Sequence, residues 1–307
     1  MNLAIECLTS EIDLSDYSLL KISHDNAFIF CDSKVTFKNE SCAFFGGWIW
    51  KDTNTNSQFI LECERWARSK GIRYLIGPYD YSTYFNYRLR TDCFNRAPFA
   101  GEPTNQLEDV QFLKQLGFSS IQNYETYHFG NMKDLIQLAD DNLTKISTKV
   151  AEKSLYFSTT HPQEILDQLK DFYLLSHEIF QDNFLYRPIP FSAFSKYFQF
   201  GLAPQICWQS TSLLKEKDTD KILGYSLNFK DPLNSKRLLI KTAGIHPEYR
   251  FMGLSFIGLT LFSIEKAKEN YSELSICLMR SGNYPTLLTS KLTFDKQNYA
   301  LFGKRLT

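Results

Sequence analysis

The residues with the clearest capacity for chemistry are Arg250-Phe251-Met252-Gly253-Leu254-Ser255, which place a cation, a glycine and a small residue between two apolar runs. Leu238–Ile240 before them indicates a strand, and the apolar stretch that begins at Ser255 indicates a helix. The first turn of a helix presents unpaired N–H groups and the positive end of the helix dipole, so it attracts anions. Gly253 permits close backbone approach there. We therefore predict an anion-binding turn at the start of this helix.

This stretch resembles the pyrophosphate loop of the GCN5-related N-acetyltransferases. The family pattern is R/Q-x-x-G-x-G/A after a strand end similar to V-x-P-x-Y-R, and here Ile245-His246-Pro247-Glu248-Tyr249-Arg250 precedes Gly253 and Ser255. Ser255 departs from the pattern, because the family prefers Gly or Ala there. A structural connection with a surface arginine is the alternative. The resemblance implies that acyl-coenzyme A is bound by Gly244, Ile245, Arg250, Phe251, Met252, Gly253, Leu254, Ser255 and Asn283.

Composition limits the class of protein. A chain of 307 residues favours two domains of about 150 residues each. Lys+Arg and Asp+Glu are both 34, and this balance argues against nucleic acid as a partner. The seven cysteines are scattered without a C-x-x-C pair, so we expect no metal site. No apolar stretch reaches the roughly 18 residues of a membrane span, and we expect a cytoplasmic protein that does not contact a membrane.

The same order of elements occurs twice, which favours an internal duplication. In the first half we expect a strand over 42–50, a polar loop over 51–57, a helix over 58–70 and a strand over 72–76. In the second half the corresponding ranges are 238–245, 246–254, 255–270 and 273–279. Gln122-Asn123-Tyr124 near the end of one half also parallels Gln297-Asn298-Tyr299 near the end of the other. We predict an α/β fold with mixed sheets in two tandem domains, residues 1–135 and 136–307.

The two halves differ at the predicted loop. Asp52-Thr53-Asn54-Thr55-Asn56 has no glycine and no arginine, and an acidic residue without nearby cations is a poor host for a diphosphate. We therefore expect a degenerate N-terminal domain and a C-terminal domain that binds the acyl carrier. Gly77-Pro78-Tyr79-Asp80-Tyr81-Ser82 resembles a G-P-x-(D/N)-x-S stretch of tandem acetyltransferase-like bacterial proteins.

Further helices are expected over 131–148, 163–180 and 191–200, with a strand over 222–229. In the superfamily the strand before the loop parts from its neighbour, and one of its amides binds the thioester carbonyl. The resemblance assigns this role to Ile245 or Gly244. It also matches Asn283 to the asparagine that contacts the pantetheine arm, although a helix cap explains Asn283 equally well.

The proton-transfer groups are less clearly marked. Many family members carry a tyrosine where this chain has Ser290, so Tyr284 is the candidate acid, unless the thiol of coenzyme A leaves without one. His177 and Glu178, with Asp182 nearby, are candidate bases. The acceptor side is expected to include Asn183, Tyr186, Arg187, Lys241 and Thr242, with Lys241 and Thr242 on alternate faces of their strand.

These residues together predict an N-acyltransferase that moves an acyl group, acetyl being the first expectation, from acyl-coenzyme A to an amine of a small molecule. Two alternatives stay open. The donor is an acyl carrier protein or an aminoacyl-tRNA, or the protein is a non-catalytic module that binds acyl-coenzyme A.

Overall fold

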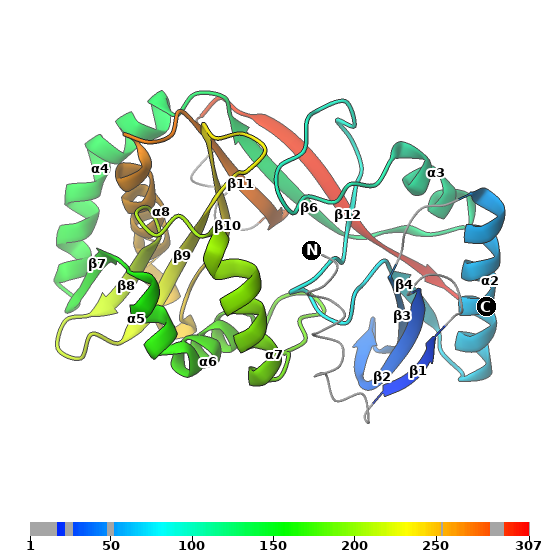
Figure 1. The fold of residues 1–307 in the computed structure, drawn as a ribbon. Helices are drawn as coiled ribbons and strands as arrows, with labels where there is room; N and C mark the ends of the chain where they lie inside the picture. Colours follow the sequence, from blue (N-terminus) through cyan, green and yellow to red (C-terminus); the bar gives the residue numbers. More distant parts are fainter. Residues whose placement is uncertain (1–16, 22–26, 48–51, 253, 283–291, 307) are drawn as a thin grey trace. The chain divides into compact units, whose positions relative to one another are not determined.

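The computed structural model describes residues 17–21, 27–47, 52–252, 254–282 and 292–306. The chain forms two compact units (Figure 1). We call the first the C-terminal unit; its described residues lie within Glu125–Asp182 and Pro190–Lys296. The second, the N-terminal unit, comprises Ile5–Tyr124, Asn183–Ile189 and Gln297–Thr307. These two units do not correspond to a single division of the chain between residues 135 and 136, because parts of the second half belong to the N-terminal unit. The boundary of the duplicated halves stays a prediction.

The C-terminal unit contains a mixed sheet, as expected. Its strands run in the order β6-β11-β10-β9-β8-β7, and β10 and β11 are parallel whereas β7, β8, β9 and β10 pair antiparallel. The strands are β6 (Ser119–Phe129, from Glu125 onward), β7 (Leu155–Thr159), β8 (Ser212–Glu216), β9 (Ile222–Lys230), β10 (Arg237–Ile245) and β11 (Glu273–Arg280). The strands predicted on either side of Arg250 are therefore confirmed, with ends shifted by a residue.

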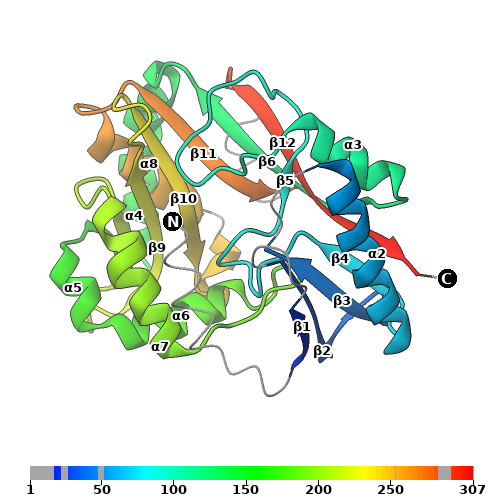
Figure 2. The ribbon, with the colours of Figure 1, turned by 45° about the vertical axis from the view of Figure 1, so that its right-hand side comes forward.

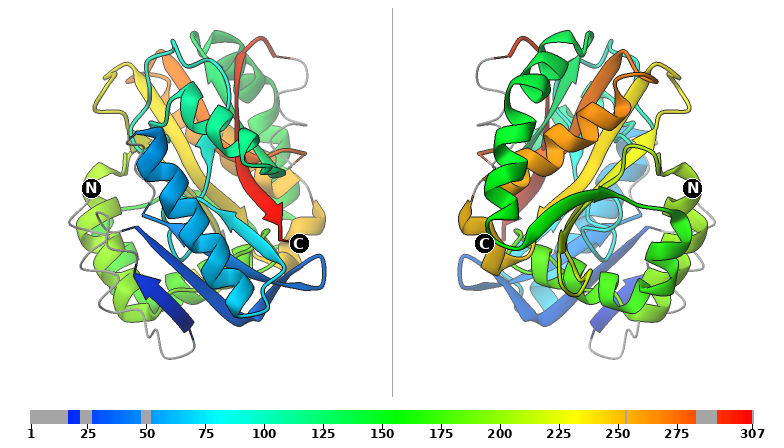
Figure 3. Two further views of the ribbon diagram at one scale, coloured as in Figure 1. Left: turned by 90° about the vertical axis from the view of Figure 1, so that its right-hand side faces the viewer. Right: turned by 90° about the vertical axis from the view of Figure 1, so that its left-hand side faces the viewer.

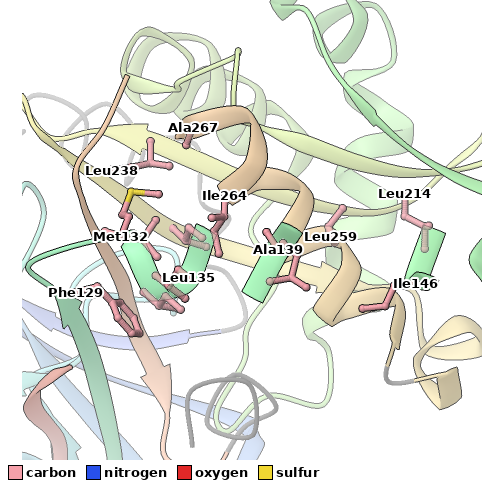
Figure 4. Close-up of a cluster of buried hydrophobic side chains, with 14 of the residues drawn as sticks. Phe129, Met132, Leu135, Ala139, Ile146, Leu214, Leu238, Leu259, Ile264 and Ala267 are labelled. Atoms are coloured by element: carbon pink, nitrogen blue, oxygen red, sulfur yellow. The ribbon is translucent and has the colours of Figure 1, made fainter. Parts of the chain in front are cut away.

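Helices cover both faces of this sheet. On one face lie α4 (Lys133–Ala151) and α8 (Leu254–Ala267), which pack on the apolar side chains of the strands (Figures 3 and 4). On the other face lie α5 (Pro162–Asp167), α6 (Leu169–Phe180) and α7 (Phe191–Lys196), followed by a π-helical turn, η1 (Tyr197–Leu202), and a 3₁₀ turn, η2 (Ala203–Gln205). The assignment of faces follows from β10, where Ile245 lies in the core with α8 whereas Gly244 faces Ile179 of α6.

The N-terminal unit has the strand order β1-β2-β3-β4-β12-β6, and β5 pairs with β12. Helices α2 and α3 pack on one face of this sheet (Figure 2). The last strand of the chain, β12, lies beside β4, so the end of the second half completes the sheet of the N-terminal unit. The elements are β1 (Tyr17–Lys21), β2 (Phe28–Phe37), β3 (Glu40–Gly46), α2 (Thr53–Ser69), β4 (Tyr74–Gly77), β5 (Leu89–Arg90), α3 (Leu107–Gln115), the first part of β6 and β12 (Asp295–Arg305).

Three predicted helices differ from those observed. Helix α2 begins at Thr53, five residues before the expected start, because Asp52 caps it by accepting a hydrogen bond from the backbone N of Thr55 at 2.9 Å. The helix expected over 163–180 is divided at Gln168 into α5 and α6, and the helix expected over 191–200 continues beyond Lys196 as the π-helical turn. In the part of the chain that the structure describes, no helix is both long and apolar enough to cross a membrane.

The packing of α8 gives a stability prediction. A Cβ atom at Gly258 would lie 2.5 Å from Cζ of Phe157 and 2.7 Å from Cγ2 of Ile146. Gly258→Val should therefore lower the free energy of unfolding by about 1–3 kcal/mol through overpacking, measured by urea denaturation. Gly130→Ala is the matched control, because nothing lies within 4 Å of a Cβ atom there. A Gly258→Val protein as stable as the parent would contradict this packing.

Candidate functional site

Two neighbouring parallel strands part in the C-terminal unit. The pairing of β10 with β11 runs from Arg237 opposite Glu273 to Ile240 opposite Ile276. Beyond that point β10 continues to Ile245 along β9, and β11 continues to Arg280. Among the described residues, the last four residues of β10, from Thr242 to Ile245, therefore have a ladder on one edge only. This is the parting that the sequence resemblance implied.

A bulge lies where the two strands part. The ladder between β10 and β9 steps from Ile240 to Thr242 while β9 advances by one residue, so Lys241 is an extra residue in β10. Thr242 pairs with Leu227, and Nζ of Lys241 lies 5.5 Å from the ring centre of Phe229, which shares the face of Leu227. Lys241 and Thr242 therefore occupy one face of the sheet, and the expectation that they alternate is wrong because the bulge interrupts the pleat.

The backbone of β10 presents hydrogen-bonding groups along the open edge. The N–H of His246 donates to the carbonyl of Leu223 in β9 at 2.8 Å. Because alternate residues of a strand direct their polar groups to opposite edges, Gly244 also faces β9 and Ile245 faces the open edge. Consistent with this direction, the carbonyl of Ile245 accepts a hydrogen bond from Nε of Arg250 at 3.0 Å. Of the two candidate amides, that of Ile245 points along the open edge.

The predicted loop after β10 is a 3₁₀ turn, η3 (Pro247–Met252), which leads into α8 at Leu254. Its geometry is fixed by His246, whose carbonyl accepts from the N–H of Tyr249 at 2.9 Å and whose Nδ1 accepts from the N–H of Glu248 at 3.3 Å. Ser255, in the first turn of α8, is 1% exposed, and its hydroxyl has no hydrogen-bond partner among the described residues. A buried hydroxyl without such a partner is costly, and an anion bound at this helix N-terminus is one kind of group that would satisfy it.

Several predicted residues lie outside the described part of the chain. They are Gly253, Asn283 and Tyr284, together with Ser290 and the side chains of Phe251 and Met252. The roles predicted for them stay predictions.

The predicted acceptor-side carboxylate of Glu178 lies next to the loop. Its Oε2 is 3.1 Å from Nε2 of His246, and the side chain is 50% exposed. The guanidinium of Arg250 donates from Nη2 to the carbonyl of Ile179, and its Nη1 is 3.9 Å from Oδ2 of Asp182. The structure therefore brings the last turn of α6 and the loop together. His177 lies half-buried on the same helix.

Asn183, Tyr186 and Arg187 belong to the N-terminal unit, within the segment Asn183–Ile189. This segment is firmly attached there. Tyr79 Oη donates to the carbonyl of Leu185 at 2.7 Å, Ser82 Oγ donates to the carbonyl of Arg187 at 2.6 Å, and the Tyr84 and Tyr186 hydroxyls are 3.3 Å apart. Arg187 also forms a buried ion pair of 2.7 Å with Asp32. The sequence indicated neither these partners nor the unit to which the segment belongs.

The N-terminal unit has a comparable pair of parallel strands, but its strands do not part in the same way. Residues 42–44 of β3 pair with residues 74–76 of β4. The chain beyond β4 then stays against β3, because the N–H of Tyr79 donates to the carbonyl of Phe45 at 2.8 Å. A Cβ atom at Gly46 would lie 2.6 Å from the carbonyl oxygen of Tyr79, so this close approach requires glycine.

A buried carboxylate completes this closed edge. The N–H of Gly47 donates to Oδ1 of Asp80 at 2.8 Å, and Asn86 Nδ2 donates to Oδ2 at 3.2 Å. Burial raises the pKa of Asp80, against the opposing effect of these two hydrogen bonds. At the start of α2, the carboxylate of Asp52 already accepts from Thr55. A negative side chain at that helix start opposes the binding of an anion.

Comparison with known proteins adds evidence on the fold. No family model matches the sequence, and no curated protein matches it significantly. Among solved structures, a tandem GNAT protein from the clavulanic acid biosynthesis pathway matches 99% of this chain and 88% of its own, with a TM-score of 0.51 and 10% identity. The fold is that of the GCN5-related N-acetyltransferases. This confirms the predicted α/β fold class and the resemblance drawn from the loop.

Two further structures share this fold. A GCN5-related glucosamine N-acetyltransferase region in a fungal multi-domain β-N-acetylglucosaminidase matches 98% of this chain, with a TM-score of 0.54 and 11% identity. This chain spans 34% of that protein's length. A protein of Enterococcus faecalis V583, titled a probable N-acyltransferase, matches 98% of this chain and 65% of its own, with a TM-score of 0.52 and 10% identity. At these identities the likeness concerns the fold alone.

The buried carboxylate of Asp80 gives a pH prediction. A carboxyl whose pKa is raised in the folded state holds its proton more tightly there than in the unfolded chain. Its contribution to stability is therefore lost as the pH rises from about 4 through the raised value. Asp80→Asn should keep an acceptor for Gly47 and remove this loss, with the amide of Asn86 turned so that its oxygen accepts from the new NH2 group. At pH 7.5 we expect Asp80→Asn to unfold at a urea concentration at least as high as the parent does. The change in the free energy of unfolding from pH 4.5 to pH 7.5 should be more favourable in the variant than in the parent.

Asp52→Asn is the control. Hydrogen bonds from Thr55 lower the pKa of Asp52, so this group contributes stability that is present above its unfolded pKa of about 4 and lost only as the pH falls below it. Removal of its charge should therefore lower stability by nearly the same amount at pH 4.5 and at pH 7.5. A loss of more than about 1 kcal/mol in Asp80→Asn at pH 7.5 would show that the ionised carboxylate is required for the closed edge.

Proposed function

We propose that this chain is an N-acyltransferase that takes an acyl group from acyl-coenzyme A and delivers it to the amine of a small molecule. The observation that carries the proposal is the parted edge of β10, which leads directly into a helix start with a buried, unpaired hydroxyl. The corresponding edge of the N-terminal unit is closed by Tyr79 and Asp80. We infer one donor site per chain, in the C-terminal unit.

The residues of the C-terminal unit fit such a donor. The backbone N–H groups at the start of α8, with the hydroxyl of Ser255, would hold the diphosphate of coenzyme A. The open edge of β10 would hold the pantetheine arm through strand-like hydrogen bonds. The N–H of Ile245 would donate to the thioester carbonyl and stabilise the negative charge that develops there. Gly244 is a less suitable donor, because its N–H is directed toward β9.

Deprotonation of the amine is assigned to Glu178. Its carboxylate is oriented by His246 at 3.1 Å and remains half exposed, so one oxygen is accessible to the amine or to an intervening water. Both imidazole nitrogens of His246 already face hydrogen-bond partners, and this makes His246 a holder of Glu178 and not a base. The thiolate of coenzyme A is a fair leaving group near neutral pH, with Tyr284 as the candidate acid.

The acceptor is proposed only as a class. The fungal neighbour is titled a glucosamine N-acetyltransferase region, and the Enterococcus protein a probable N-acyltransferase. Both names describe transfer to nitrogen, which agrees with a carboxylate base on the acceptor side. We propose acetyl as the acyl group and the cytoplasm as the location, where free thiols such as Cys42 and Cys63 stay reduced.

The test is a binding and turnover experiment. Calorimetry with coenzyme A, acetyl-coenzyme A and pantetheine should show that the two diphosphate compounds bind and pantetheine binds far more weakly. Release of free thiol from acetyl-coenzyme A should rise when a suitable acceptor is added from a panel of primary amines that includes D-glucosamine. Binding without any amine-dependent release would favour a non-catalytic module. Absence of binding to all three would contradict the proposed donor.

Ser255→Ala separates ligand binding from folding. Removal of a buried, unpaired hydroxyl should stabilise the free protein by up to about 1 kcal/mol, which corresponds to a rise of a few degrees or less in melting temperature. The same change should weaken coenzyme A, because the hydroxyl can no longer donate to the diphosphate. Thermal unfolding with and without coenzyme A measures both effects. A variant with a lower melting temperature and an unchanged affinity would contradict the assignment.

Ser263→Ala is the matched control for this experiment. It lies on the same helix, but its hydroxyl is 2.7 Å from that of Ser212, so its removal should destabilise the protein and leave the affinity for coenzyme A unchanged.

A further inference from the structure

The arginine of the loop is directed toward backbone carbonyls. Nε of Arg250 donates to the carbonyl of Ile245 at 3.0 Å, and Nη2 donates to the carbonyl of Ile179. Ile179 lies in the last turn of α6, where the final carbonyls of a helix lack partners within the helix and carry the negative end of its dipole. The guanidinium therefore satisfies one such carbonyl and one carbonyl of the open edge of β10.

Two more contacts join the loop and its strand to the same turn of α6. His246 approaches Glu178, and Nη1 of Arg250 lies 3.9 Å from the Asp182 carboxylate just beyond the helix. At Gly244, any Cβ atom would collide with Cγ2 of Ile179, so the glycine allows α6 to lie directly on the end of β10. The end of α6 is thus attached to the same loop that is proposed to hold the diphosphate.

We propose that Arg250 is a positioning residue for the last turn of α6, and that it transmits occupancy of the donor site to the acceptor-side carboxylate of Glu178. The proposal rests on the proposed function, because it takes coenzyme A as the ligand of the loop. The planar guanidinium suits this role, since it donates in two fixed directions at once. The backbone N–H groups of α8 remain the main partners of the diphosphate.

A direct ligand and a positioning residue give different results on substitution. If Arg250 bound the diphosphate, its loss would remove a charge-assisted hydrogen bond and weaken coenzyme A by roughly ten- to a hundredfold. If Arg250 positions α6, coenzyme A should bind Arg250→Gln with an affinity within about threefold of the parent, since the backbone N–H groups of α8 hold the diphosphate. The two-directional contact with Ile245 and Ile179 is nevertheless lost.

The experiment combines calorimetry with amide hydrogen exchange, on the full chain, with coenzyme A as the probe. In the parent, coenzyme A should protect the amides of residues 175–182 from exchange, because an ordered loop holds the end of α6. In Arg250→Lys and Arg250→Gln, these amides should exchange faster without ligand. Coenzyme A should still bind both variants, and its protection of residues 175–182 should be lost.

Arg237→Gln is the matched control. Arg237 also belongs to β10, and its guanidinium binds the buried carboxylate of Asp231 at 2.7 Å, so its loss should destabilise the unit without a specific effect on α6. A loss of affinity in Arg250→Gln beyond about tenfold would make Arg250 a direct ligand, and unchanged exchange at residues 175–182 would remove its positioning role. If the parent itself does not bind coenzyme A, the proposed function fails, and this is a separate result.

Discussion

The parting of β10 from β11 determines where the C-terminal unit can hold a ligand. Backbone N–H and C=O groups must find partners, so an edge that leaves its neighbouring strand inside a unit requires another strand, a side chain or a ligand. In the N-terminal unit the corresponding requirement is met internally by Tyr79 and the Asp80 carboxylate. In the C-terminal unit the carbonyl of Ile245 accepts a hydrogen bond from Arg250. The N–H of Ile245 lies on the same edge, and we assign it to the thioester carbonyl of the acyl donor. The parallel pair β3–β4 is thus closed within the N-terminal unit, whereas the corresponding pair β10–β11 offers a candidate binding edge in the C-terminal unit.

The rest of the C-terminal unit supports this edge from both faces. Helix α8 packs on one face and brings its N-terminus to the end of β10, where the dipole and Ser255 favour an anion. Helix α6 reaches the same end of β10 from the opposite face and is held there by the loop. We therefore propose that the N-terminus of α8 binds the acyl donor and that the C-terminus of α6 serves the acyl acceptor. The turn η3 contacts both helix ends. The N-terminal unit holds the segment Asn183–Ile189, which follows α6 in the chain.

The sequence predicted the order of elements around Arg250 because their patterns are local. Apolar runs, Pro247 and the spacing of the loop specify a strand, a turn and a helix within about twenty residues. Features that depend on distant partners were not predictable in this way. Nothing near Arg250 indicates that its guanidinium reaches Ile179, and nothing in residues 295–305 indicates that this strand joins the N-terminal unit.

Two errors have local causes. Asp52 was interpreted as part of a polar loop, although a carboxylate directly before a helix is a common cap, and the apolar pattern of α2 starts only in its second turn. The bulge at Lys241 was missed because it lies within a continuous β-type pattern and adds one residue without a glycine. Both cases show a side chain or backbone irregularity that overrides the average periodicity of its segment.

The number of acetyl-coenzyme A molecules bound per intact chain, determined by isothermal titration calorimetry at known active protein concentration, distinguishes one donor site from two. We predict one molecule bound per chain, because the parallel pair β10–β11 is open and its counterpart β3–β4 is closed by Tyr79 and Asp80. Two molecules per chain would contradict the closed edge of the N-terminal unit. No binding would contradict the assignment of the open edge of β10 to an acyl donor.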